Sequence, residues 1–360
     1  MLELEHVTKT VGGADHIRDV SLQLRPGTLN VLLGPTLSGK TTLMRLMAGL
    51  DQPSKGRILS DGKDVRGIPV QKRNVAMVYQ QFINYPAMTV YDNIASPLKV
   101  AGVDKATIKR EVGRAAELLR LTPYLDRTPL NLSGGQQQRT ALARAMVKQA
   151  GLVLLDEPLA NLDYKLREEL REELPKIFAE SGAIFVYATT EPSEALLLGG
   201  FTATLSEGRV TQFGPTVEVF RQPVDLITAM IFADPPLNTI RLDKKGAAFA
   251  FEGGVELPLP AGLSGIADGS YMVAFQPHHL TLARTTPQAV PLTIRVTATE
   301  ITGSESFIYL AFADARWVML APGIHGFQPD ETIEVFVEPQ RLMVFDAQGR
   351  AVRKPAAQAA

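Results

Sequence analysis

The sequence predicts an α/β fold followed by a smaller all-β domain. Up to about residue 215, strand-like segments alternate with helical ones, which is typical of a mainly parallel sheet covered by helices. Leu152–Leu155 and Ala183–Tyr187 are continuous apolar runs of the kind found in parallel strands that are buried on both faces. The Pro-rich segment Asp234-Pro235-Pro236 ends this alternation, so we expect one domain at residues 1–234 and a second at residues 235–360.

Length, charge and composition narrow the class of protein. A chain of 360 residues is expected to hold two or three domains, and its formal net charge of −1 gives no indication of nucleic-acid binding. The absence of cysteine excludes disulfides and cysteine-based metal sites and fits a reducing compartment. The start of the chain lacks the pattern of a secretion signal, and no apolar run approaches the roughly 20 residues needed to span a bilayer. We therefore expect a soluble chain that reaches a membrane only through a partner.

The N-terminal half is expected to contain strands first and then helices. Residues 2–33 read as strands, and Gly56–Ser60 and Asn74–Tyr79 are two further strand-like segments. We expect a helical subdomain at about residues 88–150, in which Asp104 caps one of the helices.

The remaining elements follow from apolar spacing. After Pro158, a charged helix is predicted with a buried stripe made of Leu166, Leu170, Leu174 and Phe178. Beyond the Pro-rich segment, the strand-like segments are Val290–Thr299, Ser306–Phe312 and Thr332–Val337. Little helical pattern accompanies them, so this second part is expected to be all-β.

The strongest motif is a phosphate-binding loop that fits G-x-x-x-x-G-K-[ST]. Its residues are Gly34, Pro35, Thr36, Leu37, Ser38, Gly39, Lys40 and Thr41. An apolar strand at residues 28–33 precedes the loop, and apolar residues at helical spacing follow it at Leu43, Leu46, Met47 and Leu50. In this context, backbone N–H groups and the positive end of the helix dipole bind phosphate oxygens. A chance glycine turn would not be expected to have both flanking elements.

The side chains of this loop predict how a nucleotide is held. Lys40 is expected to reach the β- and γ-phosphates, and the Thr41 hydroxyl is expected to ligate Mg²⁺. We also count Thr42, the next residue of the predicted helix, among the nucleotide-binding residues. The sequence therefore predicts a site for a nucleotide and Mg²⁺.

Asp156 and Glu157 directly follow a predicted buried strand, at the edge where α/β sheets hold their ligands. The Asp156 carboxylate is suited to hold Mg²⁺, and Glu157 is suited to accept a proton from an attacking water. An isolated Asp-Glu pair would more simply be an acidic surface loop. The preceding phosphate-binding loop and buried strand favour the metal and base roles.

Ser133, Gly134, Gly135 and Gln136 open another predicted helix. Glycines at a helix start expose N–H groups beside the positive end of the dipole, which makes a second anion site. A simple helix cap explains Ser133 alone, but not the whole Ser-Gly-Gly-Gln segment in a chain that also has the phosphate-binding loop.

Together these motifs resemble the ABC (ATP-binding cassette) ATPases over about the first 230 residues. The resemblance implies that Leu132–Gln136 is the signature, that Leu159–Asp163 is the D-loop, and that Gln80 senses the γ-phosphate and contributes to the metal site. It also implies a head-to-tail dimer, in which Ser133, Gly135 and Gln136 serve the nucleotide bound by the partner's phosphate loop.

Other segments resemble the ATPases of carbohydrate importers. One segment, Gln80–Ile94, lies in the first domain. The others lie in the second domain and are similar to a regulatory pair of small OB-like barrels, namely Leu237-Asn238, Phe275–Leu280, Thr299–Glu305 and Leu342–Phe345. The resemblance implies two membrane permease subunits, a second identical or homologous ATPase subunit and, indirectly, an extracytoplasmic binding protein. It places the chain at the cytoplasmic face of the cell membrane, and it suggests that Tyr85 and Met88 contact a membrane subunit.

Two positions depart from the family. Thr190 stands where the family has its switch histidine, and Val11 stands where an aromatic ring stacks on adenine. His16 is either a substitute for that ring or an ordinary surface histidine. One hypothesis is therefore a slow site paired with a second, unlike ATPase, as in polyol importers such as those for glycerol. The rival is an active homodimer in which Glu157 suffices.

A soluble ABC protein that acts on ribosomes or DNA is the alternative function. Such proteins usually carry two cassettes, long coiled coils or a basic arm, whereas this chain has one phosphate loop and no heptad run. From Pro235 onward, ten Lys/Arg stand against twelve Asp/Glu, which argues against binding to a phosphate backbone. We therefore expect no nucleic-acid partner.

Overall fold

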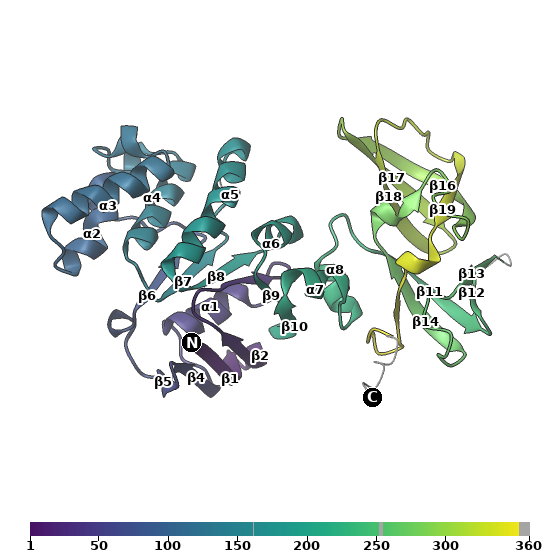
Figure 1. Cartoon of the computed structure of the whole chain (residues 1–360), viewed down its shortest axis with the longest axis horizontal. Helices are drawn as coiled ribbons and strands as arrows, with labels where there is room; N and C mark the ends of the chain where they lie inside the picture. Colours follow the sequence, from purple (N-terminus) through teal and green to yellow (C-terminus); the bar gives the residue numbers. More distant parts are fainter. Residues whose placement is uncertain (161, 252–254, 353–360) are drawn as a thin grey trace. The chain divides into compact units, whose positions relative to one another are not determined.

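The computed structural model describes residues 1–160, 162–251 and 255–352 (Figure 1). Asn161 of the predicted D-loop and the side chains of residues 177–180, among them Phe178, lie outside that description. The chain packs as two units, Met1–Arg221 and Gln222–Ala360, and each is described here by itself. The domain boundary at Asp234 and Pro235 stays a prediction.

The central sheet of the first unit is mainly parallel, as predicted. Its strands are ordered β10-β9-β3-β8-β7-β6. In that order they span Arg209–Pro215, Phe201–Ser206, Leu29–Leu33, Ile184–Thr189, Leu152–Asp156 and Val75–Val78. Each neighbouring pair from β9 to β6 is parallel, and β10 pairs with β9 in an antiparallel hairpin. The carboxyl ends of β3, β7 and β8 therefore meet at one edge, where ligands bind in sheets of this kind.

A second sheet of the first unit is antiparallel and has the order β2-β1-β4-β5. Its strands span Ala14–Leu24, Leu2–Val11, Lys55–Ser60 and Lys63–Asp64. Helix α1 (Lys40–Ala48) buries Leu43 and Met44 in a core that takes residues from both sheets. The helix ends at left-handed Gly49, so the prediction for Leu50 is wrong, because this residue lies beyond the helix and is 36% exposed.

Helices α2 (Val90–Val100), α3 (Lys105–Leu118) and α4 (Gly134–Val147) occupy the region predicted to be helical (Figure 1). Asp104 caps α3 by accepting the N–H groups of Ala106 and Thr107, which confirms the predicted cap. Three more helices complete the first unit, namely α5 (Tyr164–Ser181), α6 (Pro192–Leu198) and α7 (Thr216–Arg221). Leu166, Leu170 and Leu174 of α5 are buried as predicted. Among the described residues, the structure has no helix long and apolar enough to cross a membrane.

The second unit begins with α8 (Leu226–Ile231) and is otherwise β-rich. One sheet has the order β13-β12-β11-β14-β20, with strands Glu256–Pro258, Ala248–Ala250, Asn238–Lys245, Gly269–Phe275 and Met343–Phe345. The other has the order β15-β19-β16-β17-β18, with strands Leu280–Thr281, Thr332–Val337, Val290–Ile301, Glu305–Phe312 and Ala315–Pro322. All three segments predicted as strands from the sequence correspond to β16, β17 and β19.

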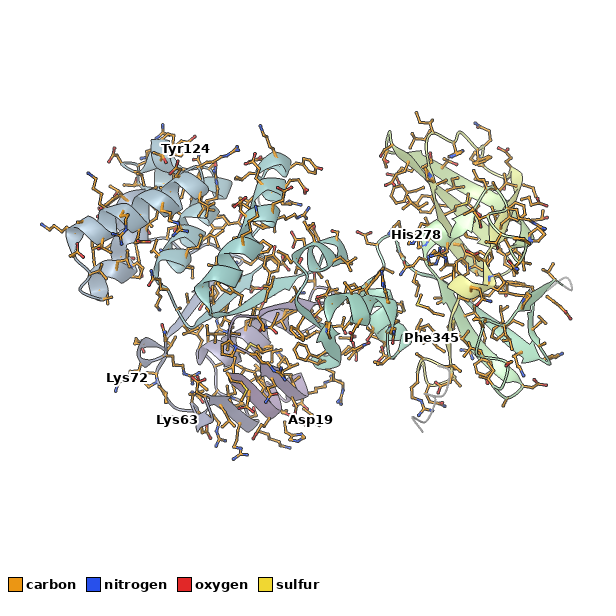
Figure 2. The ribbon with its side chains drawn as sticks, in the orientation of Figure 1. Asp19, Lys63, Lys72, Tyr124, His278 and Phe345 are labelled. Atoms are coloured by element: carbon orange, nitrogen blue, oxygen red, sulfur yellow. The ribbon has the colours of Figure 1, made fainter. Side chains whose placement is uncertain are left out.

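The two sheets of the second unit share one core. Trp317 is buried at its centre, with ring centroids 5.0 Å from Phe275 and 4.9 Å from Phe312. The side chain of Asn238, on β11, accepts the N–H of Val318 at 2.7 Å and donates to its carbonyl at 2.8 Å. Asn238 thus joins one sheet to the outer strand of the other. Phe345 (Figure 2) is buried between α8 and β14.

Candidate functional site

The loop between β3 and α1 has the backbone that a phosphate-binding loop requires. A Cβ on Gly34 would lie 2.4 Å from the carbonyl oxygen of Leu205, so no larger residue fits there. Gly39 has φ 105°, a conformation that favours glycine. Leu37 also has a left-handed φ, 66°, and its side chain is 95% exposed. The Oγ of Ser38 is buried and has no hydrogen-bond partner within the described residues.

Lys40 and Thr41, the first residues of α1, point in different directions. The Lys40 ammonium donates to the carbonyls of Gly34 at 2.7 Å and Pro35 at 3.0 Å, so it lies inside the loop. Burial lowers the pKa of Lys40, and the carboxylates of Glu157 and Asp156 oppose this shift. Lys40 is therefore a buried cation with only neutral direct hydrogen-bond partners, an arrangement suited to an incoming anion.

The start of α1 meets the end of β7 through Thr41 and Asp156. The Thr41 hydroxyl donates to Oδ2 of Asp156 at 2.8 Å. Asp156 is 3% exposed, and burial raises its pKa while the hydrogen bond from Thr41 lowers it. A hydroxyl and a carboxylate at this distance are the oxygen ligands that Mg²⁺ prefers, so the residues fit this ion. Among the described residues no cluster of three His, Cys, Asp or Glu side chains could hold a metal, so phosphate oxygens would have to complete the coordination.

Glu157 lies next to Asp156 and contacts the predicted glutamine. Gln80 donates to Oε2 of Glu157 at 2.7 Å. Glu157 has a left-handed φ of 47°, and its N–H donates to the carbonyl of Ala188, which fixes it against β8. Burial raises the pKa of Glu157, Lys40 lowers it, and Asp156 raises it further. A carboxylate with a raised pKa is suited to accept a proton.

The structure therefore brings together five predicted residues, namely Lys40, Thr41, Gln80, Asp156 and Glu157. Thr190 follows β8 and is exposed, and its side chain makes no hydrogen bond that the described part of the chain shows. Its neighbour Thr189 instead donates to the buried carboxylate of Glu194 at 2.7 Å.

Ser133 and Gln136 form a capping box at the start of α4. Ser133 accepts the N–H of Gln136 at 3.4 Å, and the Gln136 side chain accepts the N–H of Ser133 at 2.9 Å. Gly134 and Gly135 form the first residues of the helix. Figure 1 shows α4 beside α2 and α3, in a different part of the unit from α1. The structure thus explains Ser133 as a cap, and a role towards a partner's nucleotide stays a prediction.

Val11 and His16 lie at the edge of the antiparallel sheet. Val11 is 47% exposed and pairs with Ala14 across the turn between β1 and β2. His16 is exposed, and its backbone carbonyl is so close to Gly39 that a Cβ there would lie 3.1 Å away. His16 therefore lies beside the phosphate loop, whereas Val11 lies at the end of β1, next to a turn that holds no aromatic ring.

Several residues that organise the site were missed from the sequence. Asn93 is fully buried and donates to the carbonyls of Tyr85, Met88 and Thr89, while its own carbonyl accepts the N–H of Tyr85 at 2.8 Å. Asn93 therefore holds the loop between β6 and α2 in place. Asn93 lies one turn after Val90, on the apolar face of α2. A polar residue on such a face needs buried hydrogen-bond partners, and its position in the sequence could have indicated this role.

Gln138 and Arg144 of α4 were also missed. Gln138 is 1% exposed and donates to the carbonyls of Glu157 at 3.3 Å and Pro158 at 2.8 Å. The Arg144 guanidinium lies 4.9 Å from the ring centroid of Tyr85. Through these contacts α4 is tied to both the loop after β7 and the loop before α2.

The comparisons with known proteins agree with this geometry. Residues 17–160 match the family model described as ABC transporter. The chain is 33% identical to the sn-glycerol-3-phosphate import ATP-binding protein UgpC of Paracoccus denitrificans, over 95% of this chain and 96% of that protein. It is 35% identical to the UgpC protein of Rhizobium meliloti, over 97% and 99% of the two chains.

Among solved structures, the chain is similar to a dimeric, post-hydrolysis ATP-binding cassette bound to ADP and Pi. The TM-score is 0.56 at 27% identity, and the match covers 60% of this chain and 99% of the other. The fold of the first unit is therefore that of a cassette that has been seen as a dimer.

Proposed function

The chain belongs to the ATP-binding proteins of ABC transporters and is an importer ATPase, and we propose that its transporter takes up a sugar or a polyol, glycerol first among them. The relatives named for sn-glycerol-3-phosphate import, which match it over nearly the full length, support this class of cargo. The membrane subunits and an extracytoplasmic binding protein would select the cargo, and this chain would supply the motion from the cytoplasmic face.

The observation that carries the ATPase proposal is the pair of contacts from Thr41 to Asp156 and from Gln80 to Glu157. Lys40 and the N–H groups of the loop would bind the β- and γ-phosphates. Thr41, Asp156 and Gln80 would hold Mg²⁺, which neutralises charge on the phosphates when bound. Glu157, with its raised pKa, would take the proton of the attacking water. The Gln80 amide would orient this carboxylate.

We further propose that this site turns over slowly and is paired with the site of a second, unlike ATPase. Thr190 offers one hydroxyl where the family has an imidazole, and Val11 offers no ring to stack on adenine. A hydroxyl has neither the reach nor the charge of a histidine. The intact Ser133–Gln136 segment would complete the partner's site, which would carry most of the turnover.

An exposed apolar surface on the loop before α2 is the proposed contact with a membrane subunit. Ile83, Tyr85 and Met88 are 58%, 47% and 42% exposed, although Asn93 and Arg144 hold the loop firmly. Large apolar side chains that stay exposed on a fixed loop are typical of a protein contact. A rigid loop would pass motion of the site to the membrane subunit.

Purification of the intact transporter through a tag on this chain, followed by mass spectrometry, tests the assembly. Two membrane proteins plus a second ATPase would support the unlike pair, and the chain alone with two membrane proteins would support the homodimer. Ribosomal or DNA-associated partners without a membrane protein would refute the transport proposal.

The Glu157→Gln variant of that transporter tests which site works. Most of the ATPase activity is expected to remain, because the partner's site keeps its own carboxylate. Thr190→His is the matched gain-of-function variant and is expected to raise turnover. Complete loss of activity in Glu157→Gln, with the partner's glutamate intact, would contradict the slow-site proposal.

A further inference from the structure

A network of partly buried charges joins β8, α5 and α6 and takes no part in the chemistry proposed above. Its centre is Glu194 of α6, which is 4% exposed. One of its carboxylate oxygens accepts hydrogen bonds from the Tyr187 hydroxyl at 3.0 Å and the Thr189 hydroxyl at 2.7 Å. Its other oxygen pairs with Arg171 of α5 at 3.2 Å. The end of β8 is thus fastened to α5 through one carboxylate.

Arg167, one turn before Arg171 on α5, extends the network to the loop after β7. Its NH2 group donates to the carbonyl of Ala160 at 3.1 Å, and the carbonyl of Leu162 lies 3.5 Å from the same group. Its NH1 group lies 3.5 Å from the carboxylate of Glu191. Glu191 also pairs with Arg171 at 2.9 Å. We call these residues, Arg167, Arg171, Glu191 and Glu194 with Tyr187 and Thr189, the α5–α6 network.

The network joins two short segments that border the site. Ala160 and Leu162 lie a few residues after Glu157, and Glu191 directly follows Thr190. The N–H of Glu191 donates to the Thr189 hydroxyl at 3.0 Å, so the backbone at this point is held as well. The Nε atoms of Arg167 and Arg171 are buried and have no hydrogen-bond partner in the part of the chain that the structure describes, so both guanidinium groups are held through their other nitrogens.

A simpler explanation is that the charges only dock α5 on α6. That explanation accounts for the pair between Arg171 and Glu194. It does not require a guanidinium that holds two backbone carbonyls of one loop and a carboxylate of another. Only the planar, multi-donor group of arginine can make such contacts at once.

We infer that Arg167 is a positioning residue that makes the segment after Glu157 and the segment at Thr190 move as one. The inference rests on the ATPase function proposed above, since it concerns the surroundings of the proposed base. Arg167 touches neither the phosphate loop nor Glu157 through any contact of the described residues, so it would act only through the loop carbonyls and Glu191.

Hydrogen exchange of the full chain tests the inference without any nucleotide. The reporters are the N–H groups of Ala160 and Leu162, which donate to Glu157 and Leu159, and the N–H of Glu191. Arg167→Met is expected to speed exchange at all three by about tenfold, since hydrogen bonds to charged groups are lost. Arg167→Lys keeps the positive charge but loses the several N–H donors of the guanidinium, so it should give a smaller rise in the exchange rates. Amides of β3 should not change, because the variant loosens the two segments and not the whole unit.

Matched variants separate positioning from simple stability. Lys176→Met removes a cation on the same helix that pairs with Glu173 at 2.9 Å and is expected to leave all reporters unchanged. Glu191→Gln is expected to speed exchange at Ala160 and Leu162, and adding it to Arg167→Met should give no further rise at these two amides, because the guanidinium that links Glu191 to their segment is already absent. The inference is overturned if Arg167→Met changes only Ala160 and Leu162, or if its effect extends equally to β3.

A second arm adds Mg²⁺ and a non-hydrolysable ATP analogue. Protection of the phosphate-loop amides in the wild-type chain tests nucleotide binding itself, and its absence would count against the proposed function alone. When the loop is protected, the three reporters should also gain protection in the wild type but not in Arg167→Met. Equal protection of the reporters in both chains would overturn the inference while leaving the proposed function intact.

Discussion

Leu37, the left-handed leucine of the phosphate loop, is a position at which substitution by glycine should stabilise the protein rather than destabilise it. Leu37 has φ 66°, and its side chain is 95% exposed, so it gains almost nothing from burial. A left-handed conformation costs a non-glycine residue about 1–2 kcal/mol. Glycine avoids this cost but is disfavoured by about 0.5–1 kcal/mol through the entropy of the unfolded chain. Leu37→Gly should therefore stabilise the first unit by about 0.5–1 kcal/mol, and its Tm should rise by roughly 2–3 °C.

The chain allows this effect to be assigned to one unit. Its single tryptophan, Trp317, is buried in the second unit, so tryptophan fluorescence follows that unit, while circular dichroism follows both. The first unit gives the thermal transition that circular dichroism detects and tryptophan fluorescence does not. Leu37→Gly should raise the Tm of this transition. Leu130, 83% exposed in the 3-10 turn Pro129–Asn131 and without a positive φ, is the matched control. Leu130→Gly should lower the same transition, and a fall of similar size in Leu37→Gly would refute the reasoning.

Three further predictions follow from groups described above or in the second unit. Asn93→Ala should lower the stability of the first unit by about 2–4 kcal/mol in denaturant titrations, because it leaves backbone carbonyls without donors. Burial and nearby positive charge lower the pKa of His279 to about 4. Since the unfolded state then takes up its proton first, the second unit should lose on the order of 2–3 kcal/mol as the pH falls from about 6.5 to 4. Fluorescence of Trp317 would follow this loss, and His279→Phe should flatten it. Val11→Tyr should tighten ATP binding, measured by calorimetry, by roughly 5- to 100-fold, and an unchanged affinity would exclude ring stacking at this position.

The parts of the fold that were predictable have local causes. β7 and β8 are continuous apolar runs bounded by polar residues, and both were expected from the sequence. Asp104 was recognised as a cap because a short acceptor precedes an amphipathic pattern. The same local logic located the phosphate loop and the residues Asp156 and Glu157, since each directly follows a strand. The hydrogen bonds from Thr41 to Asp156 and from Gln80 to Glu157 were not predicted, because each joins residues that are far apart along the chain.

The rest depends on partners that are distant along the chain. The three ion pairs of Arg167 and Arg171 with Glu191 and Glu194 join segments separated by β8, and no local pattern pairs them. Burial of Glu194 was nevertheless foreseeable, because it lies one turn before buried Leu198 on α6. The left-handed φ of Leu37 could not be predicted from the sequence. The phosphate-loop motif allows any residue between its two glycines, so nothing in the sequence shows that this position needs a positive φ.

The amide of Asn238 has a consequence for how the chain behaves in a crowded solution. β18 is the outer strand of its sheet, and outer strands present free N–H and C=O groups that can recruit a strand from another molecule. The Asn238 side chain occupies both backbone groups of Val318 and so imitates one residue of a neighbouring strand. A passing chain finds no continuous row of hydrogen-bonding groups at the middle of β18. The Asn238 amide thus adds a backbone-like cap to a strand that also contacts β11 and β15, and together they leave little of this edge open to another chain.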